Sequence, residues 1–198
     1  MSFSLIFSMS AFALAASVSP GPVNLVGLSS GGRYPLRFGL IFVSGATVGF
    51  LLLFILVGLG LSNLFEKLPV FYQWLRWAGV AFLLSLSWML FRSGDVVHTE
   101  DAAIPGFWTG FLMQWLNPKA WLASAAGISA YAQTSQDFWL FTLLYGPICW
   151  LSLSCWVLAG AYFRRWLQQP GRIKRFNRVL SLLLFISAVA SLGPVNTI

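Results

Sequence analysis

The stretch Ser19-Pro20-Gly21-Pro22-Val23-Asn24 interrupts 31 uncharged residues that run from Ser2 to Gly32. Proline lacks an amide hydrogen, its ring clashes with the preceding helical turn, and the residue before it is pushed out of the α region. Two prolines around a glycine therefore predict a break in a helix. Because apolar sequence surrounds the break, we expect a helix that is interrupted inside a membrane.

A second break, Asn117-Pro118-Lys119-Ala120, follows 98 residues later, counted from Pro20 to Pro118. One interruption in each half of an apolar chain is typical of transporters that are built from internal repeats. In such transporters the binding site lies near the middle of the bilayer. The pair of breaks predicts one site to which both contribute.

The composition places the whole chain in a membrane. Hydrophobic residues make up 58% of the chain and charged residues only 9%, whereas soluble domains carry roughly 25% charged residues. The mean hydropathy is +0.79. The net charge of +7 could suggest a nucleic-acid partner, but six of the 12 basic residues fall between positions 164 and 178. Such clustering favours an orientation signal in a membrane protein, so no nucleic acid is expected.

The predicted fold is an all-α polytopic membrane protein with a single transmembrane domain over residues 1–198. A span needs roughly 20 apolar residues. Segments one and four are the broken ones, and the six predicted segments cover residues 4–32, 39–61, 70–91, 104–132, 138–163 and 179–195. Repeat one is expected over about 1–92 and repeat two over about 104–195, with a connector at 93–103.

Basic residues predict the orientation of the chain. The odd-numbered loops carry Arg33, Arg37, Arg92 and the six basic residues of the last loop, whereas the even-numbered loops carry only Lys67. The positive-inside rule then puts the odd loops in the cytoplasm and both termini outside. Three spans per half give the two halves opposite orientations, which predicts an inverted repeat. The sequence leaves the oligomeric state open, a homo-oligomer included.

The N-terminus has one feature of a secretory signal peptide. Ala13-Leu14-Ala15 resembles a small-residue cleavage site, but no basic residue precedes Arg33. Since a signal peptide has a basic n-region, we expect this segment to be retained.

Neither the cysteines nor the single histidine predicts a redox or metal centre. Cys149 and Cys155 lie in one apolar segment, and we expect both to be small buried hydrophobic residues. His98 lies among Asp95, Glu100 and Asp101, a pattern that usually means a solvated connector. No metal and no cofactor are expected.

The first break has the chemistry of a carboxylate site. A helix that resumes inside a membrane exposes the amides of its first turn and the positive end of its dipole, which attract anions. Pro22 suits the first helical position. Val23, Asn24 and Leu25 would then offer amides to a carboxylate, and the Asn24 side chain could meet an amino group. The alternative is a proline kink with Asn24 bonded to a neighbouring helix.

The second break places a cation within the apolar chain. At mid-span Lys119 would cost about 2.5–3.5 kcal/mol on insertion scales, and in the first turn of a resumed helix it opposes the dipole. A bound carboxylate or a watery cavity would compensate; alternatively, the segment dips in and out and leaves Lys119 at the interface. No acidic residue lies at mid-span, so we hypothesise that Lys119 alternates between a proton and the substrate.

These motifs resemble the lysine exporter (LysE/RhtB) family of bacterial amino-acid exporters over essentially the whole chain. Ser19-Pro20-Gly21-Pro22 with Gly39, Gly45 and Gly49 is similar to the family's N-terminal signature, and residues 114–120 (QWLNPKA) are similar to its central motif. The resemblance implies a six-segment proton antiporter of the bacterial inner membrane that exports amino acids or close derivatives. The expected substrate-binding and translocation residues are Pro20, Gly21, Pro22, Asn24, Gly45, Gly49, Gln114, Asn117, Pro118 and Lys119.

The chain departs from the family pattern at two positions. Many members carry an acidic residue after the glycine that corresponds to Gly49, where this chain has Phe50, and a glycine common near the start of the last helix is replaced by Ser181. Residues 107–114 and 155–160 look most like the cysteine/O-acetylserine exporter branch. Since no carboxylate is expected at mid-span, a small neutral amino acid is favoured over lysine.

Other classes of function fit the sequence less well. An intramembrane enzyme would need paired aspartates, a zinc motif or a Ser/His pair, and the spans contain none of these. A thiol–disulfide carrier needs cysteines on different helices. A metal-ion exporter would need carboxylate or histidine ligands within the spans. A non-transporting membrane assembly protein is harder to exclude, but it has no need for a break in each half.

Overall fold

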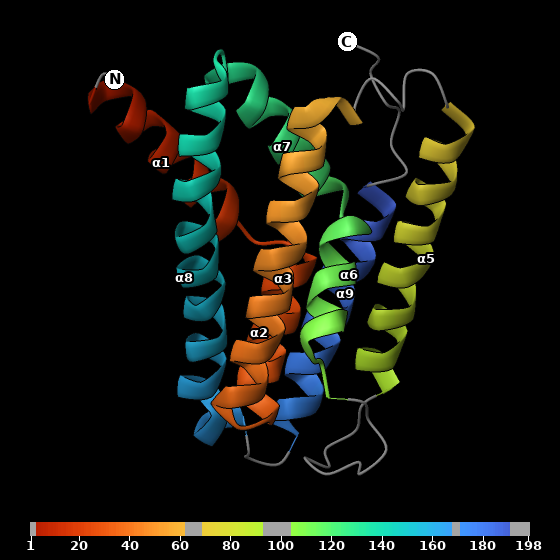
Figure 1. Ribbon diagram of the computed structural model, residues 1–198. Coiled ribbons are helices and arrows are strands. Elements are labelled where there is room, and N and C mark those ends of the chain that lie inside the picture. The colour runs from red at the N-terminus through yellow and green to blue at the C-terminus, as the bar shows by residue number, and fades with distance from the viewer. Residues whose placement is uncertain (1–2, 62–68, 93–103, 168–170, 191–198) are drawn as a thin grey trace.

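The computed structural model describes residues 3–61, 69–92, 104–167 and 171–190 (Figure 1). These residues are helical almost throughout, and no strand occurs among them. The helical elements are α1 (Phe3–Val18), α2 (Pro22–Arg33), α3 (Leu36–Leu56), η1 (Val57–Leu61), α5 (Pro69–Arg92), α6 (Phe107–Trp115), α7 (Pro118–Tyr131), α8 (Ser135–Leu167) and α9 (Arg172–Ala190).

Both breaks lie where the prolines predict them. Helices α1 and α2 meet at an angle of 61°. Pro22 opens α2, as expected, and the residue before it, Gly21, is extended (φ −163°, ψ 174°). Asn117 separates α6 from α7, and Pro118 opens α7. A missing amide hydrogen costs nothing at a first helical position, which explains both starts.

The ends of the last two helices differ from the prediction. Helix α8 continues to Leu167 and α9 already begins at Arg172, so the six basic residues expected in one loop lie on helices instead. Arginine and lysine are good helix formers, and their long side chains carry the charge beyond an apolar segment. The apolar pattern therefore placed the start of the last helix seven residues too late. The connector 93–103, with His98 and its acidic neighbours, lies outside the described residues.

Length and composition identify two to three candidate membrane spans. Residues Leu36–Gly60 and Ser135–Phe163 each qualify alone, and α1 with α2 qualifies as one bent pair. Large hydrophobic side chains are exposed on the outer faces of these helices, for example Ile41, Leu143 and Leu151. This outer surface fits a lipid environment.

The helices pack around one main core and one small core. The main core joins residues of α1, α2, α3, α6, α7 and α8, among them Phe42, Phe54 and Phe141. The small core lies between α5 and α9, where Leu83, Leu180 and Leu184 meet. In Figure 1, α5 lies at the edge of the bundle, away from α8.

Glycines bring two pairs of helices into backbone contact. On α3, a methyl group at Gly45 would lie 1.9 Å from the Phe107 carbonyl oxygen of α6, and one at Gly49 would lie 2.6 Å from the Phe111 carbonyl oxygen. On α8, a methyl group at Gly160 would lie 2.0 Å from the Leu28 carbonyl oxygen of α2. Small residues let membrane helices approach this closely. Each close seam, α3–α6 or α2–α8, joins a helix of the first half to a helix of the second.

Candidate functional site: a cavity between the two breaks

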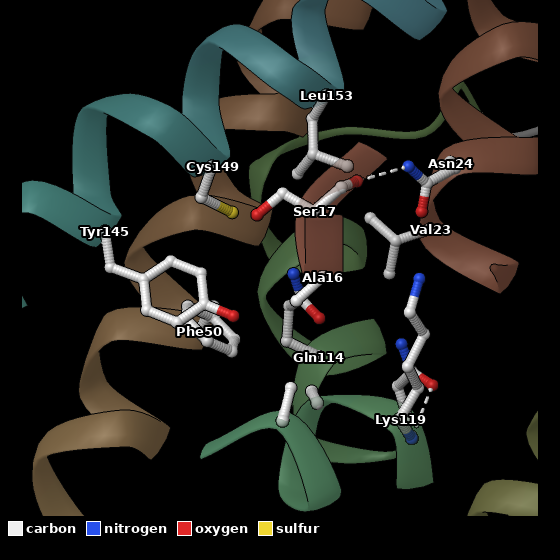
Figure 2. Close-up of a pocket in the computed structure, with 13 residues that line it drawn as sticks. Ala16, Ser17, Val23, Asn24, Phe50, Gln114, Lys119, Tyr145, Cys149 and Leu153 are labelled. Atoms are coloured by element: carbon white, nitrogen blue, oxygen red, sulfur yellow. Dashed lines mark hydrogen bonds between the residues drawn. The ribbon is translucent and has the colours of Figure 1, made fainter. Parts of the chain in front are cut away.

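A cavity of about 40 Å³ lies between the two breaks (Figure 2). At roughly 10–15 Å³ per water molecule, it has room for about three waters. Residues of α1, α2, α3, α6, α7 and α8 line it. The lining side chains that carry a polar group are Ser17, Asn24, Gln114, Asn117, Lys119, Tyr145 and Cys149.

Lys119 joins the two breaks directly. Its ammonium group donates a hydrogen bond to the carbonyl oxygen of Ser19, 100 positions earlier, at the C-terminal end of α1. A methyl group on Gly21 would lie 3.3 Å from Nζ, so the ammonium packs against this glycine. The C-terminal end of a helix carries free carbonyls and a partial negative charge, which stabilise a cation. The α1 end thus compensates the Lys119 charge in this conformation.

The first turn of α2 is partly open to the cavity. The Gly21 cap has no side chain to bond the first amides, and Val23 and Asn24 both line the cavity. The expectation for Leu25 was wrong, because its amide donates to the Gly21 carbonyl oxygen at 3.0 Å. This is the first hydrogen bond of the helix itself. Only Val23 and Asn24 remain to offer amides at this end.

One of the two polar atoms of the Asn24 side chain already makes a hydrogen bond. Its Nδ2 donates to the Ser17 carbonyl oxygen at 2.8 Å, so Asn24 also ties α2 to the end of α1. Its Oδ1 does not take part in that bond and remains as an acceptor. The amide thus has both a structural contact and a free acceptor beside the cavity.

The N-terminus of α7 is closed by its own cap. The Asn117 Oδ1 accepts a hydrogen bond from the Lys119 backbone amide at 3.2 Å, and the Ala120 amide donates to the Asn117 carbonyl oxygen at 2.9 Å. Such capping satisfies the amides that a helix start leaves free. The two breaks therefore differ: the start of α2 has no side-chain cap, whereas the start of α7 is capped by Asn117 and contributes the Lys119 side chain to the cavity.

One face of α8 forms the far wall of the cavity. Tyr145, Cys149 and Leu153 follow one another at intervals of four and so share that face. Tyr145 packs against Phe50 with 4.5 Å between ring centroids, and Figure 2 shows the Cys149 thiol pointing toward Ser17. The spacing of Tyr145 and Cys149 on one apolar helix gave no sign that they would line a site. Cys149 is buried as expected, but Cys155 is exposed because it lies on another face of α8.

The other predicted site residues lie around the cavity rather than on it. Pro20, Pro22 and Pro118 shape the two breaks, and Gly45 and Gly49 lie in the α3–α6 seam. Phe50, where many family members have an acidic residue, does line the cavity.

The lining residues include no carboxylate. Asp137 is the one acidic residue in the described part of the chain, and it pairs with Thr134 at the start of α8. No group of three or more metal-ligating residues occurs in the regions that the structure covers. Lys119 and the start of α2 therefore make the cavity attractive to an anion.

An apolar helical bundle with two broken helices around a buried polar cavity defines an integral membrane protein of the transporter class. The family model described as LysE type translocator matches residues 14–192, and the chain belongs to this family. The expected resemblance is thus confirmed.

Similar proteins include a cysteine/O-acetylserine efflux protein of Klebsiella pneumoniae, 31% identical over 193 residues that cover 96% of this chain and 97% of the relative. The protein of that name in Escherichia coli strain K12 is 31% identical over 183 residues, or 90% and 92% of the two chains. No solved structure matches the chain.

Proposed function

We propose that the protein is a secondary active exporter of small neutral amino acids or close derivatives, similar to cysteine or O-acetylserine, and that protons drive it by antiport. The family is one of translocators, and relatives that match nearly the whole chain are named for cysteine and O-acetylserine efflux. The observation that carries the proposal is the Lys119 ammonium beside the uncapped start of α2 in one cavity.

Each end of an amino acid finds a complementary group in this cavity. The substrate carboxylate is bound by the amides of Val23 and Asn24. The substrate ammonium takes the place of Lys119 at the Ser19 carbonyl oxygen, where the negative end of α1 stabilises a cation. The Asn24 and Gln114 side chains supply further acceptors. Binding thus replaces the ion–dipole contact between Lys119 and α1 by one between the substrate ammonium and α1.

The wall of the cavity favours a small uncharged side chain. Phe50, Tyr145 and Leu153 leave little free volume in this conformation, so a long substrate needs a larger opening than a short one. A cationic side chain would meet no carboxylate among the lining residues. These two features favour substrates of the size and charge of cysteine or O-acetylserine.

Lys119 also supplies the proposed link to protons. It is the one basic side chain among the lining residues, and its ammonium group occupies the Ser19 carbonyl oxygen that the substrate ammonium needs. Lys119 releases its proton to the cytoplasm, and the substrate ammonium then binds at Ser19. A proton taken up from outside restores the Lys119 ammonium, which returns to Ser19 and releases the substrate. This exchange makes Lys119 the coupling residue.

We further propose six spans in two inverted repeats, over about 1–92 and 104–195. In Figure 1 the chain runs through α1 and α2 in the direction opposite to α6 and α7, and α3 runs opposite to α8, as α5 does to α9. Helix α2 ends with Arg33, α5 with Arg92, and α9 begins with Arg172, and all three lie at the lower end of the view. By the positive-inside rule this end faces the cytoplasm of a bacterial inner membrane.

The test is proton-driven uptake of labelled O-acetylserine and cysteine into inside-out vesicles. We expect Lys119→Met to lower the initial rate about 10- to 100-fold, as for the loss of a charged hydrogen bond. We expect Lys119→Arg to lower both accumulation and substrate exchange without a proton gradient, because arginine does not release its proton and stays at the Ser19 carbonyl oxygen. The matched control is Lys174→Met, since Lys174 is exposed on α9.

Full proton-driven accumulation by Lys119→Met would refute the coupling role. A wild-type protein that transports neither compound would refute the proposed substrates. A companion screen of cells that overproduce the protein, for amino acids excreted into the medium, would then identify the exported compound.

A further inference from the structure

A second hollow lies on the outside of the bundle, between α5 and α9. It has a volume of about 470 Å³, more than ten times that of the central cavity. Trp88 and Phe91 of α5 form one wall, and Leu182 and Phe185 of α9 form the other. All four side chains are about half exposed, so the hollow is an open groove on the surface that faces lipid.

The polar groups on the floor of the groove need no hydrogen bond from a bound molecule. It contains Ser87 and Ser181, which satisfy each other: the Ser87 hydroxyl donates to the Ser181 carbonyl oxygen at 2.9 Å, and the two hydroxyl oxygens lie 3.1 Å apart. From Arg178 to Phe185 the groove follows about 10 Å of helix at 1.5 Å per residue. Its apolar walls and satisfied floor suit a hydrocarbon chain.

One end of the groove is strongly basic. Arg178 lies over the Phe91 ring at 5.8 Å, and Arg92 lies over the Trp88 ring at 5.1 Å. Lys174 and Arg175 are exposed one turn before Arg178. The described portions of α5 and α9 contain no acidic residue. These two helices therefore offer no carboxylate that could pair with the four cations. They form an anion-binding edge at the end of the bundle proposed to be cytoplasmic.

We propose that this groove binds an anionic phospholipid of the cytoplasmic leaflet, with one acyl chain between Trp88 and Phe185 and the phosphate at Arg178 and Arg92. Basic pockets between membrane helices on the cytoplasmic side bind such headgroups. The arrangement matches the two parts of a lipid: the cations lie at the membrane surface, where the phosphate lies, and the apolar walls lie deeper, where the acyl chain lies.

A second copy of this chain is a poorer occupant for electrostatic reasons. In a membrane, a twofold axis runs along the membrane normal, so two copies would meet with the same patch and the same orientation. Arg92 and Arg178 of one copy would then face those of the other. Like charges disfavour that contact, whereas an anionic headgroup neutralises them.

The lipid would also reinforce the weaker part of the fold. The α5–α9 pair is held by the small core around Leu83, Leu180 and Leu184, whereas the central helices share the large one. A chain in the groove covers the exposed side of this pair, and binding to the folded state raises its stability.

The test is lipid binding to the full-length protein in detergent, measured by native mass spectrometry with dioleoylphosphatidylglycerol and dioleoylphosphatidylcholine. Each arginine near an anionic surface contributes about fivefold in affinity. We therefore expect the phosphatidylglycerol preference of the wild type to fall about fivefold in Arg178→Gln and about 25-fold when Arg92→Gln is added.

Two further variants separate the groove from general charge effects. Arg37→Gln is the matched control, because Arg37 is also an exposed arginine over an aromatic ring, 4.8 Å from that of Phe38, on α3. It should keep the full preference. Leu182→Trp fills the groove without a change of charge and should weaken binding of both lipids.

Equal binding of the two lipids by the wild type would overturn the proposal, as would an equal loss in Arg37→Gln and Arg178→Gln. A dimer that Leu182→Trp dissociates, in a protein that binds no phosphatidylglycerol, would also overturn it and assign the groove to a second copy. These measurements involve no transport, so their outcome is independent of the proposed substrate.

Discussion

At the scale of single residues, Tyr145 offers a sharp test of the cavity. Its phenol is almost fully buried and packs on Phe50, and Figure 2 shows its hydroxyl directed into the cavity. We expect Tyr145→Phe to raise the KM for O-acetylserine about two- to tenfold, as for a lost neutral hydrogen bond. The free energy of unfolding should change by less than about 1.5 kcal/mol, the upper value for one neutral hydrogen bond.

The control for this change is Tyr162→Phe, on the same helix. Tyr162 is 83% exposed and lies away from the cavity, so transport should not change. The measurement is initial uptake into inside-out vesicles over a range of substrate concentrations. An unchanged KM in Tyr145→Phe would remove this hydroxyl from the binding site.

The individual residues show why a site is only partly readable from a sequence. Proline and asparagine act on their own backbone, so the breaks and the positions of Pro22 and Pro118 at helix starts could be predicted. The Lys119 contact with Ser19 could not, because it joins positions 100 apart. Tyr145 was missed for a similar reason: the rotation of α8 about its axis depends on packing and not on local pattern.

At the scale of elements, the two glycine seams make a strong prediction. We expect Gly45→Ala to destabilise the protein by at least about 1–3 kcal/mol, the usual cost of overpacking, since its methyl group would overlap the Phe107 backbone. Gly160→Ala should do the same against Leu28. Thermal unfolding in detergent, followed by size-exclusion chromatography, measures the loss.

Gly106→Ala is the control for both substitutions. The nearest atom to a methyl group there is the Ile104 carbonyl oxygen at 3.9 Å, an ordinary contact. Gly106 is the N-cap residue of α6, so its replacement by alanine should lower the free energy of unfolding by at most about 1 kcal/mol. If Gly45→Ala were equally stable, the backbones of α3 and α6 would have to lie further apart than the structure places them.

The elements themselves could be predicted well except at charged ends. The apolar pattern located α3, α5, α6 with α7, and α8 to within a few residues, but it set the start of α9 at Val179 and not at Arg172. Hydropathy indicates which part of a helix lies within lipid, whereas the helix itself can extend beyond the edge of the lipid. The six basic residues between 164 and 178 were therefore assigned to a loop, although they belong to the last turn of α8 and the first turns of α9.

At the scale of the whole molecule, the orientation in the membrane can be tested with cysteine labelling. In a background with Cys149→Ser and Cys155→Ser, we expect Gln133→Cys to react with an impermeant maleimide in intact cells. Arg37→Cys should react only in inside-out vesicles. Both positions are exposed. Gln133 lies between α7 and α8, and Arg37 lies in the first turn of α3, at the opposite end of the bundle (Figure 1). The reverse pattern would contradict the positive-inside assignment.

The two seams have a consequence for how the carrier changes shape. Backbones in direct contact cannot slide or separate by small degrees, so α3 with α6 and α2 with α8 are expected to move as two stiff units. Each unit contains one helix from each half of the chain, so the halves cannot rock against each other as separate blocks. The cavity lies between these units: Phe50 and Gln114 belong to one, and Asn24 and Tyr145 to the other. Displacement of one unit past the other would therefore open the proposed binding site and reshape its walls in a single step.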